Sequence, residues 1–401
     1  MEYVGAKRRA YAGLKTKEQK TAAIGEFCLI TGAERKYAIK LLTGSRRYRE
    51  RKGRGKTYTP AAEALLLRLW RASGRMTPRY LATVLGRQMD ALRELEHVDD
   101  AAAGQVLGMS ASTMERVLRR HPREAPRRRN RRSGANALAA SVPCVPGEAA
   151  PPAGPGEAQA DTVAMCGGDA GGNFFWILDA TDRLTQWTQC HAAWNRGAAA
   201  TQAALADAEG AFPFPLTGLH SDSGPEFLNA HVLGYARQRP TPLPFTRSRP
   251  GNKNDNARVE QKNASVIREY LGYDRLDRFE LKSDLDRLCE KISLYNNLFR
   301  PCKRLISKTK KKDGHGFIKE YDTPRPPLDR ALDTGRVAPA PAARLTKQRD
   351  QTNPVSLLED IRRRAALILR KQAKLGNPQT TRGAAAPGGG GTAPGVQHLT
   401  H

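Results

Sequence analysis

The spacing of apolar residues predicts helices in the first third of the chain. Apolar positions recur at helical intervals before Gly32 and again between Gly32 and Gly44. The residues that form these two stripes are Ile24, Phe27, Cys28, Tyr37, Ala38, Leu41 and Leu42. We therefore expect two helices with a turn at Thr31-Gly32. A helix pair joined by a short turn that contains glycine is typical of a helix-turn-helix.

The second helix of this pair carries basic residues on its polar side. In a helix-turn-helix, Arg35, Lys36 and Lys40 would point outward towards a DNA groove. A similar pair is expected in residues 99–121, where Gly108 turns the chain and Ser110 or Ser112 caps the next helix. The more apolar residues between the two pairs are expected to supply core. A generic helical bundle is the alternative, and charge together with turn position favours DNA binding.

The middle of the chain has short apolar runs typical of strands. Three such runs, at 161–168, 173–181 and 184–192, follow one another closely and predict antiparallel strands. An alanine-rich helix is expected at about 197–209. A strand that ends at Asp222, a helix at about 225–237, a strand at 243–248 and a helix from near Asn256 follow. These elements predict an α/β fold with a mixed sheet and helices on its faces.

Composition and charge divide the chain further. The net charge is +27, of which residues 1–134 carry +18, residues 276–401 carry +12 and residues 160–275 carry −1. A nearly neutral core between basic flanks indicates a polyanionic partner, most often a nucleic acid. We expect a helical DNA-binding region at 1–133, an Ala/Pro/Gly-rich linker at 134–156 and a catalytic core at 157–300. A basic C-terminal region at 301–378 and a disordered tail at 379–401 complete the chain.

Several classes of protein are disfavoured. No run of about 18 apolar residues predicts a membrane span, and the N-terminus lacks the apolar segment of a signal peptide. The six cysteines include no C-x-x-C pair and have no histidines at zinc-site spacing. We therefore expect a cytoplasmic, nucleoid-associated protein with free thiols.

Three acidic residues stand out by their positions. Asp161 opens a strand, Asp222 ends one, and Glu260 lies near the start of a helix in an otherwise basic and amide-rich stretch. Each alone is more often a cap, a turn residue or a solvated side chain. Together, converging carboxylates suit Mg²⁺ or Mn²⁺. Two such ions can activate a nucleophile and stabilise a leaving oxygen in phosphoryl transfer.

Three stretches carry a family resemblance. In order, "QADTVAMCGG", "HSDSGPEFLN" and "RPGNKNDNARVEQKN" resemble the DDE transposases and integrases of bacterial insertion sequences. This resemblance covers about 155–275 and implies a ribonuclease-H-like core with a mixed five-stranded sheet. It also implies that Asp161, Asp222 and Glu260 are the catalytic metal ligands. The spacing of 37 residues between Asp222 and Glu260 is slightly longer than in many members.

The resemblance implies an activity and its partners. Members bind the terminal inverted repeats of their element, nick its ends and join the freed 3′-OH to target DNA, as homo-oligomers and without a small-molecule cofactor. Two ions of Mg²⁺ or Mn²⁺ would serve the reaction. The residues expected to contact DNA around the glutamate are Lys253, Asn256, Arg258 and Lys262. A ribonuclease-H-like nuclease that cuts without joining and a non-catalytic DNA-binding regulator are the alternatives.

Other residues of the core compete for these roles. Asp179 or Asp182 could replace Asp161 as first ligand, with Asp182 ranked second. Glu226 is expected one turn into the helix after Asp222, where it would steady that helix. His220 could position water, although a packing histidine is the commoner case.

The C-terminal region is expected to be mainly helical. Residues 279–301 predict an amphipathic helix that closes the core, and residues 303–316 a basic linker. Residues 314–332 weakly resemble the segment that follows the core in such transposases. Residues 353–376 predict a second amphipathic helix that either pairs subunits or packs onto the same chain.

Overall fold

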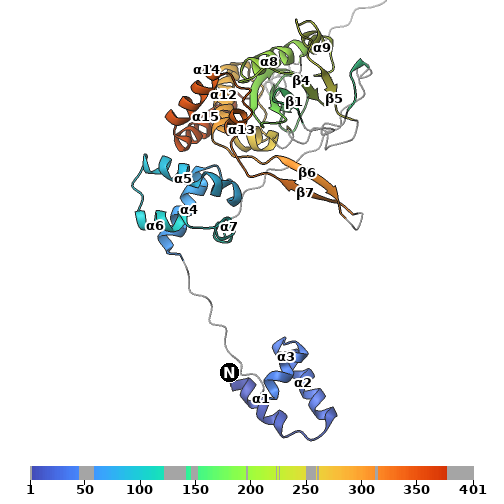
Figure 1. Ribbon diagram of the computed structural model, residues 1–401, viewed down its shortest axis with the longest axis vertical. Coiled ribbons are helices and arrows are strands. Elements are labelled where there is room, and N and C mark those ends of the chain that lie inside the picture. Colours follow the sequence, from blue (N-terminus) through green and yellow to red (C-terminus); the bar gives the residue numbers. More distant parts are fainter. Residues whose placement is uncertain are drawn as a thin grey trace, which may run out of the picture. The chain divides into compact units, whose positions relative to one another are not determined.

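The computed structural model describes residues 2–44, 58–121, 141–145, 152–195, 197–222, 224, 226–249, 259, 262–311 and 315–376. The chain divides into two compact units, Met1–Tyr58 and Thr59–His401 (Figure 1). The division lies inside residues 1–133, which the sequence suggests as a single helical region. Most of the expected linker at 134–156 and the whole of the tail at 379–401 lie outside the described residues.

The first unit consists of three helices, α1 (Glu2–Ala12), α2 (Lys17–Thr31) and α3 (Arg35–Leu42). Helix α2 begins with a capping box, because the Thr16 side chain accepts from the backbone N–H of Gln19 while the Gln19 side chain accepts from that of Thr16. It is capped at its C-terminus by Gly32, whose left-handed backbone conformation (φ 65°) is typical of a helix end. The buried core of the unit is Ile24, Phe27, Ala38, Leu41 and Leu42. The predicted helix pair and its apolar stripes are confirmed.

Four helices begin the second unit: α4 (Pro60–Ala72), α5 (Pro78–Arg93), α6 (Asp100–Leu107) and α7 (Ala111–Leu118). Helix α7 starts at Ser110, whose hydroxyl accepts from the backbone N–H of Thr113. Of the two serines considered from the sequence, Ser110 is therefore the cap. Leu66, Leu69, Leu81, Met89 and Met114 are among the fully buried side chains of these helices.

A five-stranded mixed sheet follows, made of β1 (Glu157–Ala164), β2 (Phe175–Asp182), β3 (Thr188–Trp194), β4 (Gly218–Ser221) and β5 (Phe245–Arg247). Its strand order is β3-β2-β1-β4-β5. The pairs β1–β2 and β2–β3 are antiparallel, whereas β1–β4 and β4–β5 are parallel. The predicted mixed sheet with helices is thus present, and it is consistent with a ribonuclease-H-like core.

Helices cover this sheet and its β3 edge. Helix α8 (Ala198–Gly210) packs on β3 and β2 and against α9 (Ala230–Arg237). Helix α12 (Lys282–Leu298) lies along β3, where Asn297 donates to the Thr188 carbonyl (2.7 Å) and accepts from the Thr188 N–H (2.8 Å). Ser293 accepts from the Cys190 N–H at 2.9 Å. These side chains satisfy an edge that would otherwise offer unpaired backbone groups.

The C-terminal region contains a hairpin that the sequence analysis did not predict. Strands β6 (Leu305–Lys310) and β7 (Phe317–Tyr321) form a separate two-stranded antiparallel sheet. The expectation of a basic linker at 303–316 was therefore wrong. Lysine-rich sequence disfavours strands on average, but cross-strand pairing with β7 makes residues 305–310 a strand here.

Three helices end the described chain: α13 (Pro327–Asp333), α14 (Pro339–Gln351) and α15 (Pro354–Leu375). The apolar side of α15 is covered by α12, α5 and α4 and by the short helix α11 (Glu269–Leu271) of the same chain. Leu358 and Ile361 are fully buried there, and Arg362 donates to the Arg71 carbonyl at 3.0 Å. Of the two possibilities left open by the sequence, α15 packs onto its own chain. No described helix combines the length and the apolar composition that a membrane crossing requires.

Candidate functional site

One aspartate lies in strand β1, and a second directly follows the end of the neighbouring parallel strand β4. Asp161 follows Ala160 in β1, Asp222 follows Ser221 at the end of β4, and Ala160 and Ser221 are register partners. Adjacent strands lie about 4.8 Å apart, and side chains alternate between faces. Positions 161 and 222 therefore share one face and one level of the sheet. Asp161 does not open its strand as expected, because β1 begins earlier, at Glu157.

Each of these carboxylates receives hydrogen bonds that fix its orientation. Oδ1 of Asp161 accepts from the backbone N–H of Thr162 at 2.8 Å, and Oδ2 accepts from the side-chain amide of Asn263 at 2.7 Å. Oδ1 of Asp222 accepts from the backbone N–H of Gly224 at 2.9 Å. Hydrogen bonds donated to a carboxylate favour its charged form. Both side chains are partly exposed.

The segment that supplies Asn263 is held along β1. Residues Asn263–Arg268 form a π-helical stretch that continues into α11 (Glu269–Leu271). Arg268 donates to the carbonyl of Ala164 at the end of β1 (2.8 Å) and to that of Gly272 (2.9 Å), and its guanidinium lies over the Tyr273 ring. Asn263 and Arg268 thus attach the helix to β1 at two points. π-helical turns inside helices are frequent at functional sites.

A buried aspartate and a buried lysine lie beside this site. Asp179 in β2 is the register partner of Asp161, so positions 161 and 179 share a face. Asp179 is fully buried and accepts from the Thr181 hydroxyl at 3.0 Å, while its Oδ2 accepts no hydrogen bond from a described residue. Burial raises the pKa of Asp179 to about 7, although the Lys262 ammonium and the Thr181 hydroxyl oppose this rise. Lys262 itself is 8% exposed.

The carboxylate of Asp182, the competing acid, accepts hydrogen bonds within a turn. It is fully buried, and its Oδ1 accepts from the backbone N–H of Gly156 at 2.7 Å. Its Oδ2 accepts from the backbone N–H groups of Leu184 and Thr185 and from the Thr185 hydroxyl. Four donors therefore occupy this carboxylate, which argues against Asp182 as a ligand.

Glu226 lies outside the helix in which it was expected. Helix α9 begins at Ala230 with Asn229 as its cap, so Glu226 belongs to the loop before it. Its carboxylate is buried and accepts from the Thr162 hydroxyl at 3.3 Å, next to Asp161. A Cβ added at Gly224 would lie 2.5 Å from this carboxylate, so the Glu226 side chain would have to move to admit one.

His220 is a packing residue, as the sequence favoured. Its Nδ1 lies 2.9 Å from the Thr246 hydroxyl and its Nε2 lies 3.1 Å from the Ser248 hydroxyl. Because both ring nitrogens are bonded to neighbouring strands, the imidazole ties β4 to β5.

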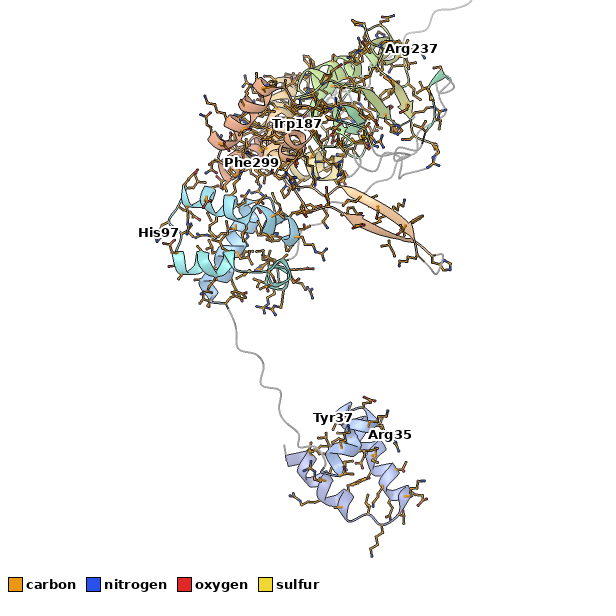
Figure 2. All side chains as sticks on the ribbon, viewed as in Figure 1. Arg35, Tyr37, His97, Trp187, Arg237 and Phe299 are labelled. Atoms are coloured by element: carbon orange, nitrogen blue, oxygen red, sulfur yellow. The ribbon has the colours of Figure 1, made fainter. Side chains whose placement is uncertain are left out.

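The remaining predicted residues fall into three sets. Glu260, Lys253, Asn256 and Arg258 lie outside the described residues. Arg35, Lys36 and Lys40 are all exposed on α3, as a helix-turn-helix would require, and Figure 2 labels Arg35 there. Lys262 is 8% exposed, and its ammonium opposes the rise of the Asp179 pKa; its predicted contact with DNA stays a prediction.

The chemistry of the two aspartates fits a divalent cation. Carboxylate oxygens from two adjacent strands are the hard ligands that Mg²⁺ and Mn²⁺ prefer. Among the described residues, no three His, Cys, Asp or Glu side chains are grouped as a metal site. Asn263 is the site residue that sequence reasoning missed. The available signal was its spacing of three from Glu260, which in a helix places two side chains on one face.

Comparison with known proteins gives one extensive relative. No family model matches the chain. The chain is 34% identical over 325 residues to the uncharacterized protein y4rM of Sinorhizobium fredii, an alignment that covers 78% of this chain and 90% of that protein. Among solved structures, the catalytic core domain of BIV integrase matches 45% of this chain and 95% of that chain, with 14% identity and a TM-score of 0.29. The sheet itself is defined by its own strand order and register.

Proposed function

The chain belongs to the family of the Sinorhizobium fredii protein y4rM, and we propose that it is a DDE-type DNA transposase. It would bind the terminal inverted repeats of an insertion sequence, cut their 3′ ends and join them to target DNA. The observation that carries the proposal is the placement of Asp161 and Asp222 at one level and on one face of β1 and β4. The three stretches of resemblance add Glu260 as the third acid.

The chain's own residues would hold the acids as oriented anions. Asn263 and the Thr162 N–H bond the two oxygens of Asp161, and the Gly224 N–H bonds Asp222. These donors favour the ionised carboxylates that hard cations need. Two Mg²⁺ or Mn²⁺ ions bound there would supply the activation of the attacking oxygen and the stabilisation of the leaving oxygen.

Glu260 enters the proposal by its place in the sequence. It lies three residues before Asn263, whose amide donates to Asp161. This spacing is the one at which two helical residues share a face. Together with the family resemblance, this place in the sequence is the basis on which Glu260 is proposed as the third ligand.

The charge distribution supports DNA as the partner. Residues 1–134 carry +18 and residues 276–401 carry +12, beside a core that is nearly neutral. The exposed residues Arg35, Lys36 and Lys40 on α3 would contact the element ends. A homo-oligomer would hold two ends together. No small-molecule cofactor is needed for this chemistry.

A strand-transfer assay tests the proposal. Purified full-length protein is incubated with labelled DNA that ends in the element's terminal repeats, with supercoiled target DNA and with Mg²⁺, Mn²⁺ or chelator. We expect cut ends and joined products only with a divalent cation. Asp161→Asn, Asp222→Asn and Glu260→Gln should each abolish both products while DNA binding persists.

A matched control separates the site from the rest of the core. Asp207 is exposed on α8, so Asp207→Asn makes the same chemical change outside the site and should leave both products unchanged. Cutting without joining would support a nuclease instead. Binding without cutting by the wild type would support a regulator, and full strand transfer by Glu260→Gln would refute the triad.

A further inference from the structure

The β6–β7 ribbon (residues 303–321) is attached firmly at its base. Arg330 of α13 is 8% exposed, and it donates to both oxygens of Asp322 and to the carbonyls of Cys302 (2.8 Å) and Thr323 (3.1 Å). The backbone N–H of Arg304 donates to Asp322 at 2.7 Å. The buried Arg330 side chain therefore holds the backbone just before β6 and just after β7. Figure 1 shows the two strands as a long ribbon.

Beyond this base, the ribbon is exposed. All five residues of β7 are exposed, including Phe317, Ile318 and Tyr321. An isolated two-stranded hairpin is only marginally stable in water. A ribbon that is fixed at its base and exposed along β7 leaves its surface available to a binding partner.

The two faces of the ribbon differ in chemistry. Lys308 and Lys319 are register partners, so they share a face, and alternation along β7 places Phe317 and Tyr321 on it as well. We call these four residues the lysine face. The opposite face carries Ser307, Thr309, Ile318 and Glu320. Glu320 is the single acidic residue among the described ribbon residues 303–311 and 315–321, and it accepts from the Ser307 hydroxyl at 3.0 Å.

Aromatic rings support the charges of the lysine face. The Lys308 ammonium lies 4.6 Å from the centre of the Phe317 ring, and the Lys303 ammonium lies 5.5 Å from that of Tyr321. Such cation–π contacts orient an ammonium without neutralising it. Within the described residues, no ion pair involves Lys308 or Lys319.

The pairing of two lysines is unfavourable for the hairpin alone. Like charges directly opposite each other on antiparallel strands are destabilising. An acid on the same face would relieve the repulsion, but Glu320, the acid among the described residues of the ribbon, lies on the other face. Residues that oppose local folding are expected at functional sites. A bound polyanion would relieve the repulsion between Lys308 and Lys319.

We propose that the β6–β7 ribbon is an arm that binds double-stranded DNA, with its lysine face on the phosphate backbone. The major groove of B-DNA admits a two-stranded β-ribbon, and lysine–phosphate contacts position a protein without reading sequence. The identification of the polyanion as DNA rests on the proposed function. Pairing of two ribbons through this face is disfavoured, because it would bring one lysine face against another.

Binding of a labelled duplex of arbitrary sequence to the full-length protein tests the arm. Fluorescence anisotropy is recorded over a series of salt concentrations. Lys308→Gln/Lys319→Gln should weaken binding on the order of tenfold to fiftyfold at about 0.1 M salt, and should reduce the slope of log K against log[salt] by about 1.8. Lys308→Arg/Lys319→Arg should restore the affinity, because arginine also binds phosphate.

A neighbouring residue on the other face gives a charge-matched control. Lys319→Gln and Ile318→Glu each lower the net charge by one and are adjacent in β7, but they lie on opposite faces. Lys319→Gln should weaken binding several-fold, whereas Ile318→Glu should change it by less than about twofold, since screening limits the reach of a charge that faces away. Both positions are exposed, so the melting temperature should stay unchanged.

The outcomes separate the arm from the proposed function. Equal affinity and equal salt slope of Lys308→Gln/Lys319→Gln and wild type would overturn the arm alone. A change in the oligomeric mass of this variant, with its DNA affinity unchanged, would assign the ribbon to self-association instead. Failure of the wild type to bind any duplex would overturn both the arm and the transposase.

Discussion

The side-chain amide of Asn263 donates a 2.7 Å hydrogen bond to Oδ2 of Asp161 across 102 positions of sequence. The bond joins the helix after the last sheet strand to the central strand β1. Since the Thr162 N–H bonds the other oxygen, Asp161 is restricted to one orientation. In the proposed function, Asn263 would be a positioning residue that acts on the metal through Asp161.

Asn263→Ala should weaken the binding of Mg²⁺ during cleavage without removing a proposed ligand. Loss of a residue that orients a metal ligand typically costs about 10–100-fold in metal affinity or activity. Cleavage of labelled end DNA is measured against Mg²⁺ concentration. We expect the half-saturating Mg²⁺ concentration to rise and activity to recover partly at high Mg²⁺.

Asn353→Ala is the control for Asn263→Ala. Asn353 caps α15 through the N–H groups of Val355 and Ser356, so its loss should cost about 1 kcal/mol of stability. Its Mg²⁺ dependence should match the wild type. If Asn263→Ala shows the same Mg²⁺ dependence as Asn353→Ala, the amide does not position Asp161.

The strands of the core could be predicted because their patterns are local. Apolar runs bounded by glycine and polar turns identified β1, β2 and β3, and the mixed sheet followed from their spacing. The location of Asp222 at a strand end came from the turn that follows it. Strand starts were less accurate, since the pairing of Glu157 with Gly218 extends β1 back into alanine-rich sequence.

The partners of the site could not be predicted, because they depend on tertiary contacts. The spacing of Asn263 from Glu260 was a local signal, but it does not identify Asp161, 102 positions away in the sequence, as the partner of the amide. Lys262 looked like a surface base, and only the packing of its helix on the sheet buries it near Asp179. The β6–β7 ribbon was missed because its lysines lower strand propensity while cross-strand pairing overrides it.

Asp179→Asn should change how stability depends on pH. Burial raises the pKa of Asp179 from 3.8 to about 7, so the folded state keeps a proton that the unfolded chain releases. Its contribution to stability is complete below about pH 4 and is lost as the pH rises through about 7. In urea unfolding with chelator present, the free energy of unfolding of the variant relative to the wild type should rise by on the order of 1–3 kcal/mol between about pH 5 and about pH 8.

Asp207→Asn serves as the reference for this pH series. Asp207 is exposed on α8, so its variant should follow the wild-type curve at every pH. Parallel curves for Asp179→Asn and the wild type would mean that Asp179 is already ionised at neutral pH, held so by Lys262.

Asn297→Ala should destabilise the sheet through its edge strand. Its amide bonds both the N–H and the carbonyl of the buried Thr188, and each unsatisfied group costs about 1–3 kcal/mol. We expect a loss of about 2–5 kcal/mol in urea unfolding. The neighbouring Asn296 is equally buried but donates only to Ile292 in its own helix, so Asn296→Ala should cost clearly less. Equal losses would mean that packing volume, not edge pairing, sets the cost.

Ile361→Ala should destabilise the second unit by about 2–5 kcal/mol, the range for a buried isoleucine or leucine cut to alanine. Ile361 is fully buried on α15, which packs on α12, α11, α5 and α4 of the same chain. Leu367 lies on the same helix but is 47% exposed, so Leu367→Ala should cost less than about 1 kcal/mol. Because the contacts of Ile361 are within one chain, the loss caused by Ile361→Ala should be the same at low and high protein concentration. A loss that grows on dilution would instead place this side of α15 between subunits.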